Sequence, residues 1–575
     1  MGTRKPQKIL WLTTLISTAA LGAVTACGDD DGGDGGSESG GSGGKGGSSP
    51  TGGKGGSSGS GGSPGDGGTS GKGGSSSKGG TDQGGSGGAE AGAGGEPAGG
   101  AGSAGDGGSG GDSIEYWTNG VTASGISSTV DDRFHGVAVD AANNVYAAGY
   151  LGEGVATTGT SRQVVVAKYG ANGQLVNGFG QQGLALADLS PYLGLPDDTT
   201  TTASDPDASQ ETARDVALQS TGKIVVAGVV EDPTVATPDR TTPLNVFVMR
   251  FDATGARDNG FAAGSVVAGV RILNPNGNST NPLVYGVAVD STDRIYVFAH
   301  GNATHATRTD QDRYVYRLSE SGNLDTNFGT GGFFTFDVPN GTSTLALGDN
   351  ARRGMVLPNG TVVASGYTPV AGRNQIVLAQ LTAAGAADTT FSGDGIVRLS
   401  PFPLGFAECY GIAVQSDGSI VTTGYGNPDV ERGTANTLLD MVSFRVRANG
   451  AVDPTWAGNG GLAYDVNSGE DRGRAILALA DDRILVAGAG TLTPADKDAM
   501  LLLLDKNGMV AEDFDPTGRK LYGAFGSIND EFFALAKTPG TAGGVVAAAG
   551  YAATGGTGMI TNGNGTLVIV PIVTP

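Results

Sequence analysis

The chain has 575 residues and a net charge of −22, from 35 basic and 57 acidic side chains. This balance argues against a nucleic-acid-binding protein, because phosphate contacts require a basic surface. Only two cysteines and three histidines are present, so a disulfide framework is excluded and histidine-dependent chemistry has few candidates.

The N-terminus has the pattern of an export signal. Arg4, Lys5 and Lys8 precede an apolar run that ends in VTAC at Cys27. The run is short and rich in Thr, Ser and Ala, which favours a signal peptide over a membrane span. Residues 1–27 resemble a bacterial lipoprotein signal peptide, and the alternative is an ordinary signal with an incidental cysteine. The resemblance implies acylation of Cys27 and lipid anchorage of the exported chain at the outer membrane or cell surface.

Residues 28–112 consist almost entirely of Gly and Ser with scattered Lys, Asp and Pro. Such a segment has no apolar surface to bury and would lose much backbone entropy on folding. It is therefore predicted to be a disordered tether between the lipid anchor and the rest of the chain.

Residues 113–575 contain one pattern repeated seven times. Each unit opens with two apolar strands around a tight polar turn, as in GIAVQSDGSIVTTGY (411–425). The turns carry the Gly, Asn and Asp that hairpins need, and β-branched residues dominate the second strand. A third strand, another turn, an aromatic residue shortly before Gly and a fourth strand follow, as in YVYRLSESGNLDTNFGTGGFFTFD. Such units predict an all-β, seven-bladed β-propeller whose first strands line a central channel.

The last unit is incomplete. It ends in TLVIVPIVTP, which is its third strand, and lacks the aromatic–Gly tail. The stretch YWTNGVTASG, just after the tether, has that tail, with Trp117 three residues before Gly120. The N-terminal strand is therefore expected to complete the last blade and close the ring, leaving no open sheet edge.

The hairpin AVQSDGSIVTTGY and the tail GNLDTNFGTGG resemble the delta-60 repeat, a tandem repeat of surface and secreted proteins in deltaproteobacteria. The resemblance covers the chain from about residue 113 onward. It implies a propeller-like fold and a surface location. It transfers no catalytic residue, because the family has no assigned activity.

Two long loops are candidate binding sites. Rigid scaffolds often carry binding residues on long, variable loops, and the segments at 191–212 and 231–243 are both long and acidic. Clustered oxygen ligands would suit a calcium or other cationic ligand, and a merely solvated loop is the alternative. The residues concerned are Asp197, Asp198, Asp205, Asp207, Glu211, Glu231, Asp232 and Asp239.

A second metal candidate combines His300 and His305 with Asp310 and Asp312. Imidazole and carboxylate ligands suit several metals. However, His300 occupies the position that a tyrosine holds in other units, which favours a structural role. Those tyrosines are Tyr150, Tyr367, Tyr425 and Tyr551, and they could line a binding face or the rim of the core.

Further polar residues recur with the repeat and are therefore interpreted as structural. Asp258, Asp325, Asp388 and Asp453 each precede the aromatic residue by three positions, which favours a turn. Acid–Arg pairs before the first strands could suggest acid–base chemistry but, because they recur, fit contacts between blades better; they are Asp132 and Arg133, Glu211 and Arg214, and Asp471 and Arg472.

Together these observations predict a lipid-anchored surface propeller that binds protein or glycan, without catalysis and without an obligatory cofactor. A secreted hydrolase or lyase that uses the channel is the first alternative. A calcium-stabilised structural module is the second. The fold cannot choose among them, because propellers have many functions.

Overall fold

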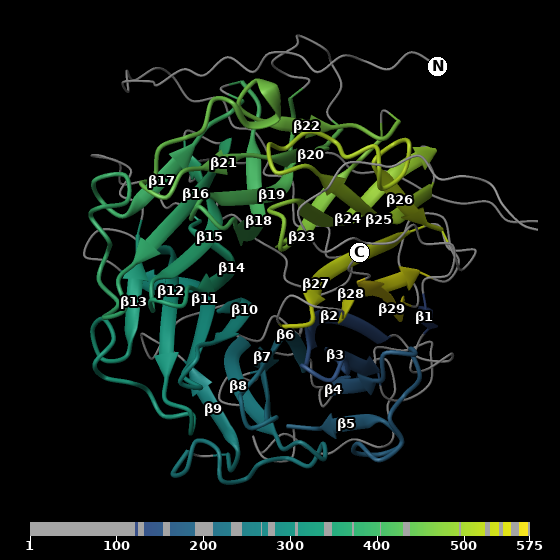
Figure 1. The fold of residues 1–575 in the computed structure, drawn as a ribbon. Coiled ribbons are helices and arrows are strands. Elements are labelled where there is room, and N and C mark those ends of the chain that lie inside the picture. The colour runs from purple at the N-terminus through teal and green to yellow at the C-terminus, as the bar shows by residue number, and fades with distance from the viewer. Residues whose placement is uncertain are drawn as a thin grey trace, which may run out of the picture. The chain divides into compact units, whose positions relative to one another are not determined.

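The computed structural model describes residues 121–572, apart from 125–131, 153–161, 190–210, 232–243, 274–281, 305–308, 338–347, 371–372, 429–437, 494–495, 524–528, 540–543 and 554–562 and the single residues 266, 403 and 468. The described strands form seven small antiparallel sheets, each a blade with four main strands, arranged as a ring (Figure 1). The predicted seven-bladed β-propeller is confirmed. A single 3₁₀ turn, η1 (Trp456–Gly458), interrupts the β structure within the described part.

The strands are numbered in chain order and fall into four layers from the centre outward. The innermost strands are β2 (Asp132–Val139), β6 (Thr212–Leu218), β10 (Leu283–Val289), β14 (Asn350–Val356), β18 (Ala407–Val414), β23 (Arg472–Ala478) and β27 (Asp530–Lys537). The second strands are β3 (Val145–Gly152), β7 (Ile224–Glu231), β11 (Ile295–Thr304), β15 (Val362–Val370), β19 (Ile420–Gly426), β24 (Ile484–Thr493) and β28 (Gly544–Ala553). The third are β4 (Arg162–Tyr169), β8 (Leu244–Phe251), β12 (Thr309–Leu318), β16 (Arg373–Leu381), β20 (Asp440–Ser443) with β21 (Arg445–Val446), β25 (Asp496–Leu504) and β29 (Gly563–Ile572). The outermost are β5 (Leu184–Ala187), β9 (Val270–Leu273), β13 (Phe333–Phe336), β17 (Ile396–Leu399), β22 (Leu462–Tyr464), β26 (Arg519–Tyr522) and β1 (Val121–Ser124).

The ring closes in the predicted way. β1 pairs antiparallel with β29, so the first strand of the described chain is the outermost strand of the seventh blade. The innermost strands of the first and seventh blades, β2 and β27, contact each other, as do all other neighbouring innermost strands. Figure 1 shows the N-terminal strand β1 beside β29. The closure gives the seventh blade the same four-stranded build as the others.

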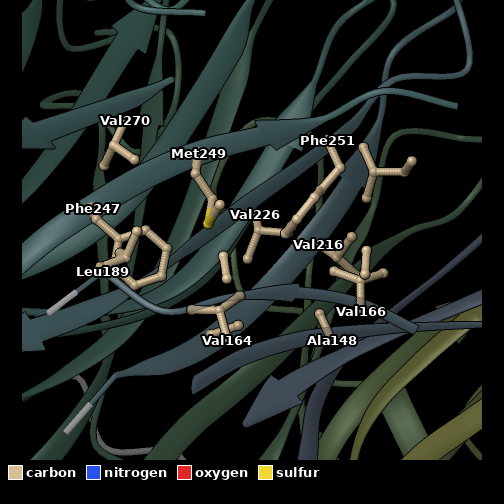
Figure 2. Close-up of a cluster of buried hydrophobic side chains, with 14 of the residues drawn as sticks. Ala148, Val164, Val166, Leu189, Val216, Val226, Phe247, Met249, Phe251 and Val270 are labelled. Carbon is tan, nitrogen blue, oxygen red and sulfur yellow. The ribbon is translucent and has the colours of Figure 1, made fainter. Parts of the chain in front are cut away.

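The hydrophobic core lies between neighbouring blades. One cluster joins Val164 and Val166 of β4 in blade 1 to Phe247 and Met249 of β8 in blade 2, and all four are fully buried (Figure 2). Because a blade is covered on both faces, its inner strands carry continuous apolar runs. The strand β3, VYAAGYLG, has seven of its eight residues buried for this reason.

The repeated aspartates shape the turn before the outermost strand. Asp258 accepts the Gly260 N–H at 3.0 Å and binds Arg250 of β8 at 2.8 Å. The Arg250 guanidinium in turn lies 4.7 Å from the centre of the Phe261 ring. The same arrangement recurs around Asp325 and Asp453, while a glutamine replaces the arginine beside Asp388. The predicted turn-forming role of these aspartates is confirmed.

Candidate functional site

Every innermost strand contains a β-bulge at the same place. The register with the second strand skips a residue, for example between Phe134 and Gly136 of β2 and between Cys409 and Gly411 of β18. A bulged residue leaves the ladder, and its side chain is redirected. The residues at this position in blades 1 to 7 are His135, Arg214, Tyr285, Arg352, Tyr410, Arg474 and Phe533.

The bulge explains the glycine that recurs in the second strand. In blade 5 the bulge brings the Glu408 carbonyl onto Gly424, where a Cβ atom would lie only 1.9 Å from the oxygen. In blade 1 a Cβ on Gly149 would lie 1.7 Å from the Arg133 carbonyl. A side chain does not fit at these positions, so the glycine in motifs such as TTGY accompanies the bulge.

The seven bulged residues surround one cavity in the middle of the ring, together with Arg353. The space among these side chains, with the open solvent at its mouth included, is about 410 Å³. The bulges lie in the first half of each innermost strand. The cavity is therefore nearer the face that carries the blade-to-blade connections.

Arg353 closes the cavity on its inner side. The position after the bulge is Gly or Ala in five blades, but it is Asp215 in blade 2 and Arg353 in blade 4. The Arg353 Nη1 lies 2.8 Å from Asp215 Oδ1. Its Nη2 donates to the carbonyls of His135 at 2.9 Å and of Phe533 at 3.3 Å. One guanidinium thus links blades 4, 2, 1 and 7 across the channel.

Arg352 lies in an aromatic enclosure in the cavity wall. Its guanidinium carbon is 4.3 Å from the ring centre of Tyr285 and 4.4 Å from that of Tyr410. Its Nη2 donates to the hydroxyls of Tyr410 and Tyr367, each at 3.0 Å. Cation–π contact and these hydrogen bonds hold the planar group in one orientation.

A second arginine in the wall, Arg474, is paired with a buried carboxylate. Its Nε lies 2.7 Å from Glu531 Oε1, and its guanidinium is 4.5 Å from the Tyr410 ring centre. Burial by itself would raise the pKa of Glu531, but Arg474, Lys497 and Arg472 outweigh it and hold that pKa at about 2. Glu531 is therefore ionised at neutral pH.

Two other groups in the wall can exchange protons. The hydroxyls of Tyr410 and Tyr425 lie 3.0 Å apart, so the pair extends the hydrogen-bond network of Arg352. The His135 ring stacks on Phe533 with 5.2 Å between ring centres. Histidine and tyrosine both serve as general acids or bases in enzymes.

The four repeated tyrosines of the second strands are buried behind this wall. Tyr367 and Tyr425 touch it through their hydroxyls, whereas Tyr150 and Tyr551 pack ring against ring on His135 and Phe533. They thus support the bulged residues from behind. The interpretation of these tyrosines as the rim of the core is confirmed.

His300 has the structural role that its position in the repeat suggests. Its side chain is buried, its Nδ1 accepts the Ala351 N–H at 3.0 Å, and its ring packs on Tyr285. It thereby connects blades 3 and 4. Asp310 and Asp312 are also buried, whereas His305 lies outside the described residues.

Asp312 belongs instead to a group with Asp337 and Asp349. Carboxylate oxygens of the three lie within 4.8 Å of one another, close enough to hold a cation. Thr368 donates a hydrogen bond to Asp349, and both Asp312 and Asp349 are almost fully buried. We interpret the group as part of the junction between blades 3 and 4.

The predicted acidic loops fall mostly outside the described residues. This applies to Asp197, Asp198, Asp205, Asp207, Asp232 and Asp239. Glu211 is buried just before β6, where it accepts the Leu189 N–H at 2.7 Å, and Glu231 is the last residue of β7. Glu211 therefore contacts the preceding blade, and a binding role for the loops stays a prediction.

Cys27 and the tether at 28–112 also lie outside the described residues. No helix in the described part is long and apolar enough to cross a membrane. Cys409 is fully buried, and burial raises the pKa of its thiol to about 12.

The cavity could not be predicted from the sequence because of the bulge. The bulge interrupts the alternation of inward and outward residues in the innermost strands, so its residue could not be assigned to the channel. One signal was present, however. The repeats agree on small residues and valines around this position but place His, Arg, Tyr or Phe at it. Where one register of a regular repeat carries large side chains whose chemistry differs from blade to blade, that register indicates a functional surface.

The comparison with protein families supports the fold. Residues 357–391 match a protein family described as a β-propeller domain of unknown function, DUF5122. No curated protein matches the chain. The PQQ-bound aldose sugar dehydrogenase of Streptomyces coelicolor is 14% identical, with 57% of this chain and 92% of that chain covered at a TM-score of 0.29. An arabinobiose complex of the Penicillium chrysogenum α-L-arabinanase is 10% identical, with 62% and 92% covered at a TM-score of 0.35.

A mannose phosphorylase of Leishmania mexicana is 12% identical, with 55% of this chain and 86% of that chain covered at a TM-score of 0.28. At these identities and TM-scores the likeness carries no argument about this chain. The prediction that the chain has no catalytic activity is wrong in its basis, because the wall of the channel contains His135, Tyr410 and four arginines.

Proposed function

We propose that this protein is an exported hydrolase or lyase that acts on the end of a saccharide chain in the central cavity. The observation that carries the proposal is the convergence of the seven bulged residues on one space. These residues combine aromatic rings, guanidinium donors and groups that exchange protons. That combination suits a sugar ring, which packs its apolar face and hydrogen-bonds through its hydroxyls.

The closed floor favours action at a chain end. Arg353 spans the channel through its contacts with Asp215 and the His135 carbonyl, so a long chain has no passage through the ring. A terminal sugar unit can enter from the mouth, with the rest of the chain outside. The expected products are single sugar units or short end fragments.

Each side chain has a distinct proposed task. Tyr285, Tyr410 and Phe533 offer their ring edges to the sugar, because Arg352, Arg474 and His135 pack on their faces. Arg352 and Arg474 bind its oxygen atoms. Hydrolysis and elimination both require proton transfer at the glycosidic bond. Tyr410 and His135 are the wall residues suited to that transfer.

The test is release of end products from a panel of neutral and acidic polysaccharides by the purified protein. Hydrolysis is followed by new reducing ends, and elimination by the ultraviolet absorbance of an unsaturated product. The Tyr410→Phe variant, which keeps the ring and removes the hydroxyl, should lose at least about 100-fold in rate. The matched control is Tyr464→Phe, because the Tyr464 hydroxyl bonds Thr517 and Arg519 away from the cavity.

Absence of product from every polysaccharide would contradict the catalytic part of the proposal. Equal rates for Tyr410→Phe and the native protein would remove Tyr410 from the reaction.

We also propose that the chain belongs with delta-60 repeat surface proteins and is anchored by lipid at Cys27. The support is the signal pattern that ends in VTAC and the glycine–serine tether after it. Metabolic labelling with a radioactive fatty acid should mark the native chain and not a Cys27→Ser variant. Equal labelling of both would exclude this anchor.

A further inference from the structure

We infer that the cavity is specific for a sugar unit that bears an oxyanion, either a carboxylate or a sulfate. The inference rests on the proposed function, because it names the class of saccharide that the same site would take. It starts from a contrast between the whole chain and its centre. The chain has a net charge of −22, whereas four of the eight residues that line the cavity are arginines.

None of the eight lining residues is acidic. Asp215 binds Arg353 at 2.8 Å, and Glu531 binds Arg474 at 2.7 Å. Glu531 is also 3.8 Å from Lys497, so it is shared between two cations. The lining therefore carries more positive than negative charge. Walls of low polarity concentrate such a field and attract anions.

The geometry of Arg352 indicates where the oxyanion binds. The hydroxyls of Tyr367 and Tyr410 and the rings around the guanidinium fix its plane before any ligand arrives. Both Nη2 hydrogens are taken by these hydroxyls and Nη1 donates to the Ala351 carbonyl at 3.1 Å, so Arg352 offers an oxyanion mainly its charge. Arg214 lines the same cavity, with its guanidinium 5.8 Å from the Tyr285 ring centre. A ligand on this side thus meets two arginines around one aromatic ring.

Neutral sugars offer this wall no charge to bind. A buried guanidinium loses hydration when a neutral ligand covers it, and the hydroxyls of a sugar replace that hydration only in part. The same contacts that favour an acidic sugar therefore disfavour a neutral one. The expected discrimination is about 10- to 100-fold in affinity.

The experiment is isothermal titration of the purified protein with three ligands that differ in charge. Methyl glucoside is neutral, methyl glucuronoside carries a carboxylate, and glucoside 6-sulfate carries a sulfate. We expect one or both anionic ligands to bind at least about 10-fold more tightly than the neutral one, and more weakly as salt rises. The comparison of the two anionic ligands distinguishes the carboxylate from the sulfate.

Two variants place the effect in the cavity. Arg352→Gln should weaken the anionic ligand about 10- to 100-fold. Arg352→Lys should recover only part of that loss, because lysine lacks the planar group that packs on the Tyr285 and Tyr410 rings. Arg214→Gln gives an independent test if the first variant does not fold, with folding checked by circular dichroism. The matched control is Arg398→Gln, since Arg398 is partly exposed on β17 and pairs with Asp394.

The outcomes separate this inference from the proposed function. Binding of the neutral and anionic ligands with equal affinity would overturn the inference and leave a saccharide site in place. Anion binding that is unchanged in both Arg352→Gln and Arg214→Gln would also overturn it. Binding of none of the three would contradict both proposals.

Discussion

Arg353 in blade 4 and Asp215 in blade 2 form an ion pair of 2.8 Å across the channel, at a register where the other five blades carry Gly or Ala. The two residues depart from the repeat together. Asp215 also accepts the Val287 N–H at 3.0 Å. The pair thus connects blades that are not neighbours and gives the cavity its floor.

Removal of one partner should destabilise the ring. Arg353→Ala leaves Asp215 buried and without this guanidinium, and we expect a loss of about 2 kcal/mol because Arg353 keeps some solvent contact. Denaturant unfolding measures the loss. The double variant Asp215→Ala with Arg353→Ala should cost less than the two single changes added together. A strictly additive result would show that the pair is not coupled.

The glycine opposite the bulge should not tolerate a side chain. In Gly424→Ala the new Cβ would start 1.9 Å from the Glu408 carbonyl, so the bulge must shift. We expect a loss of about 2–3 kcal/mol in the free energy of unfolding. Gly178→Ala is the control, since no atom lies within 4 Å of its added Cβ. Similar losses for both variants would contradict the steric account.

The stability of the ring should fall in acid because of Glu531. Its pKa is lowered from 4.5 in an open chain to about 2 in the fold. A lowered pKa stabilises the fold above the higher value, and that stabilisation is lost as the pH falls from about 4.5 towards 2. Melting temperatures across this interval should drop less steeply for Glu531→Gln than for the native protein. Parallel curves would assign the acid sensitivity to other groups.

The Cys409 thiol should be unreactive until the propeller unfolds. It is fully buried, and burial raises its pKa to about 12, so little thiolate forms near neutral pH. In a Cys27→Ser background, which leaves one thiol, Ellman's reagent should react only as fast as the fold opens. Rapid labelling of the folded protein would show that the Cys409 thiol is open to solvent.

The strand β1 should hold the ring closed. Its register with β29 joins Val121 to Ile569 and Ser124 to Thr566. Deletion of residues 113–124 would expose the edge of β29, and exposed edges promote association between chains. We expect the shortened protein to melt at a lower temperature and to form oligomers in size-exclusion chromatography. A monomer of unchanged stability would show that the closure contributes little.

The fold could be predicted largely from local signals, because each repeat carries its own hairpin turns and apolar strands. The role of β1 also followed from the sequence, since the last unit ends at the strand after Gly563 and the missing tail stands just before Val121. Both inferences use short stretches of chain whose pattern does not depend on the rest of the fold.

The site could not be predicted in the same way. His135 and Phe533 stack although almost four hundred residues separate them, and only closure of the ring brings them together. Arg214 was noticed in the sequence, but its neighbour Glu211 led to a structural interpretation. Glu211 does contact the preceding blade, whereas the bulge directs Arg214 into the cavity. The extra residue of the bulge in β6 turns Arg214 towards the cavity, while Glu211 stays at the contact with the preceding blade.

The most direct test of the account is a crystal structure of the protein soaked with methyl glucuronoside and with glucoside 6-sulfate. The account predicts a sugar in the central cavity, with its oxyanion on Arg352 and its ring against Tyr285 or Tyr410. A sugar bound only at the loops on the outer parts of the blades, with the cavity filled by water, would contradict it.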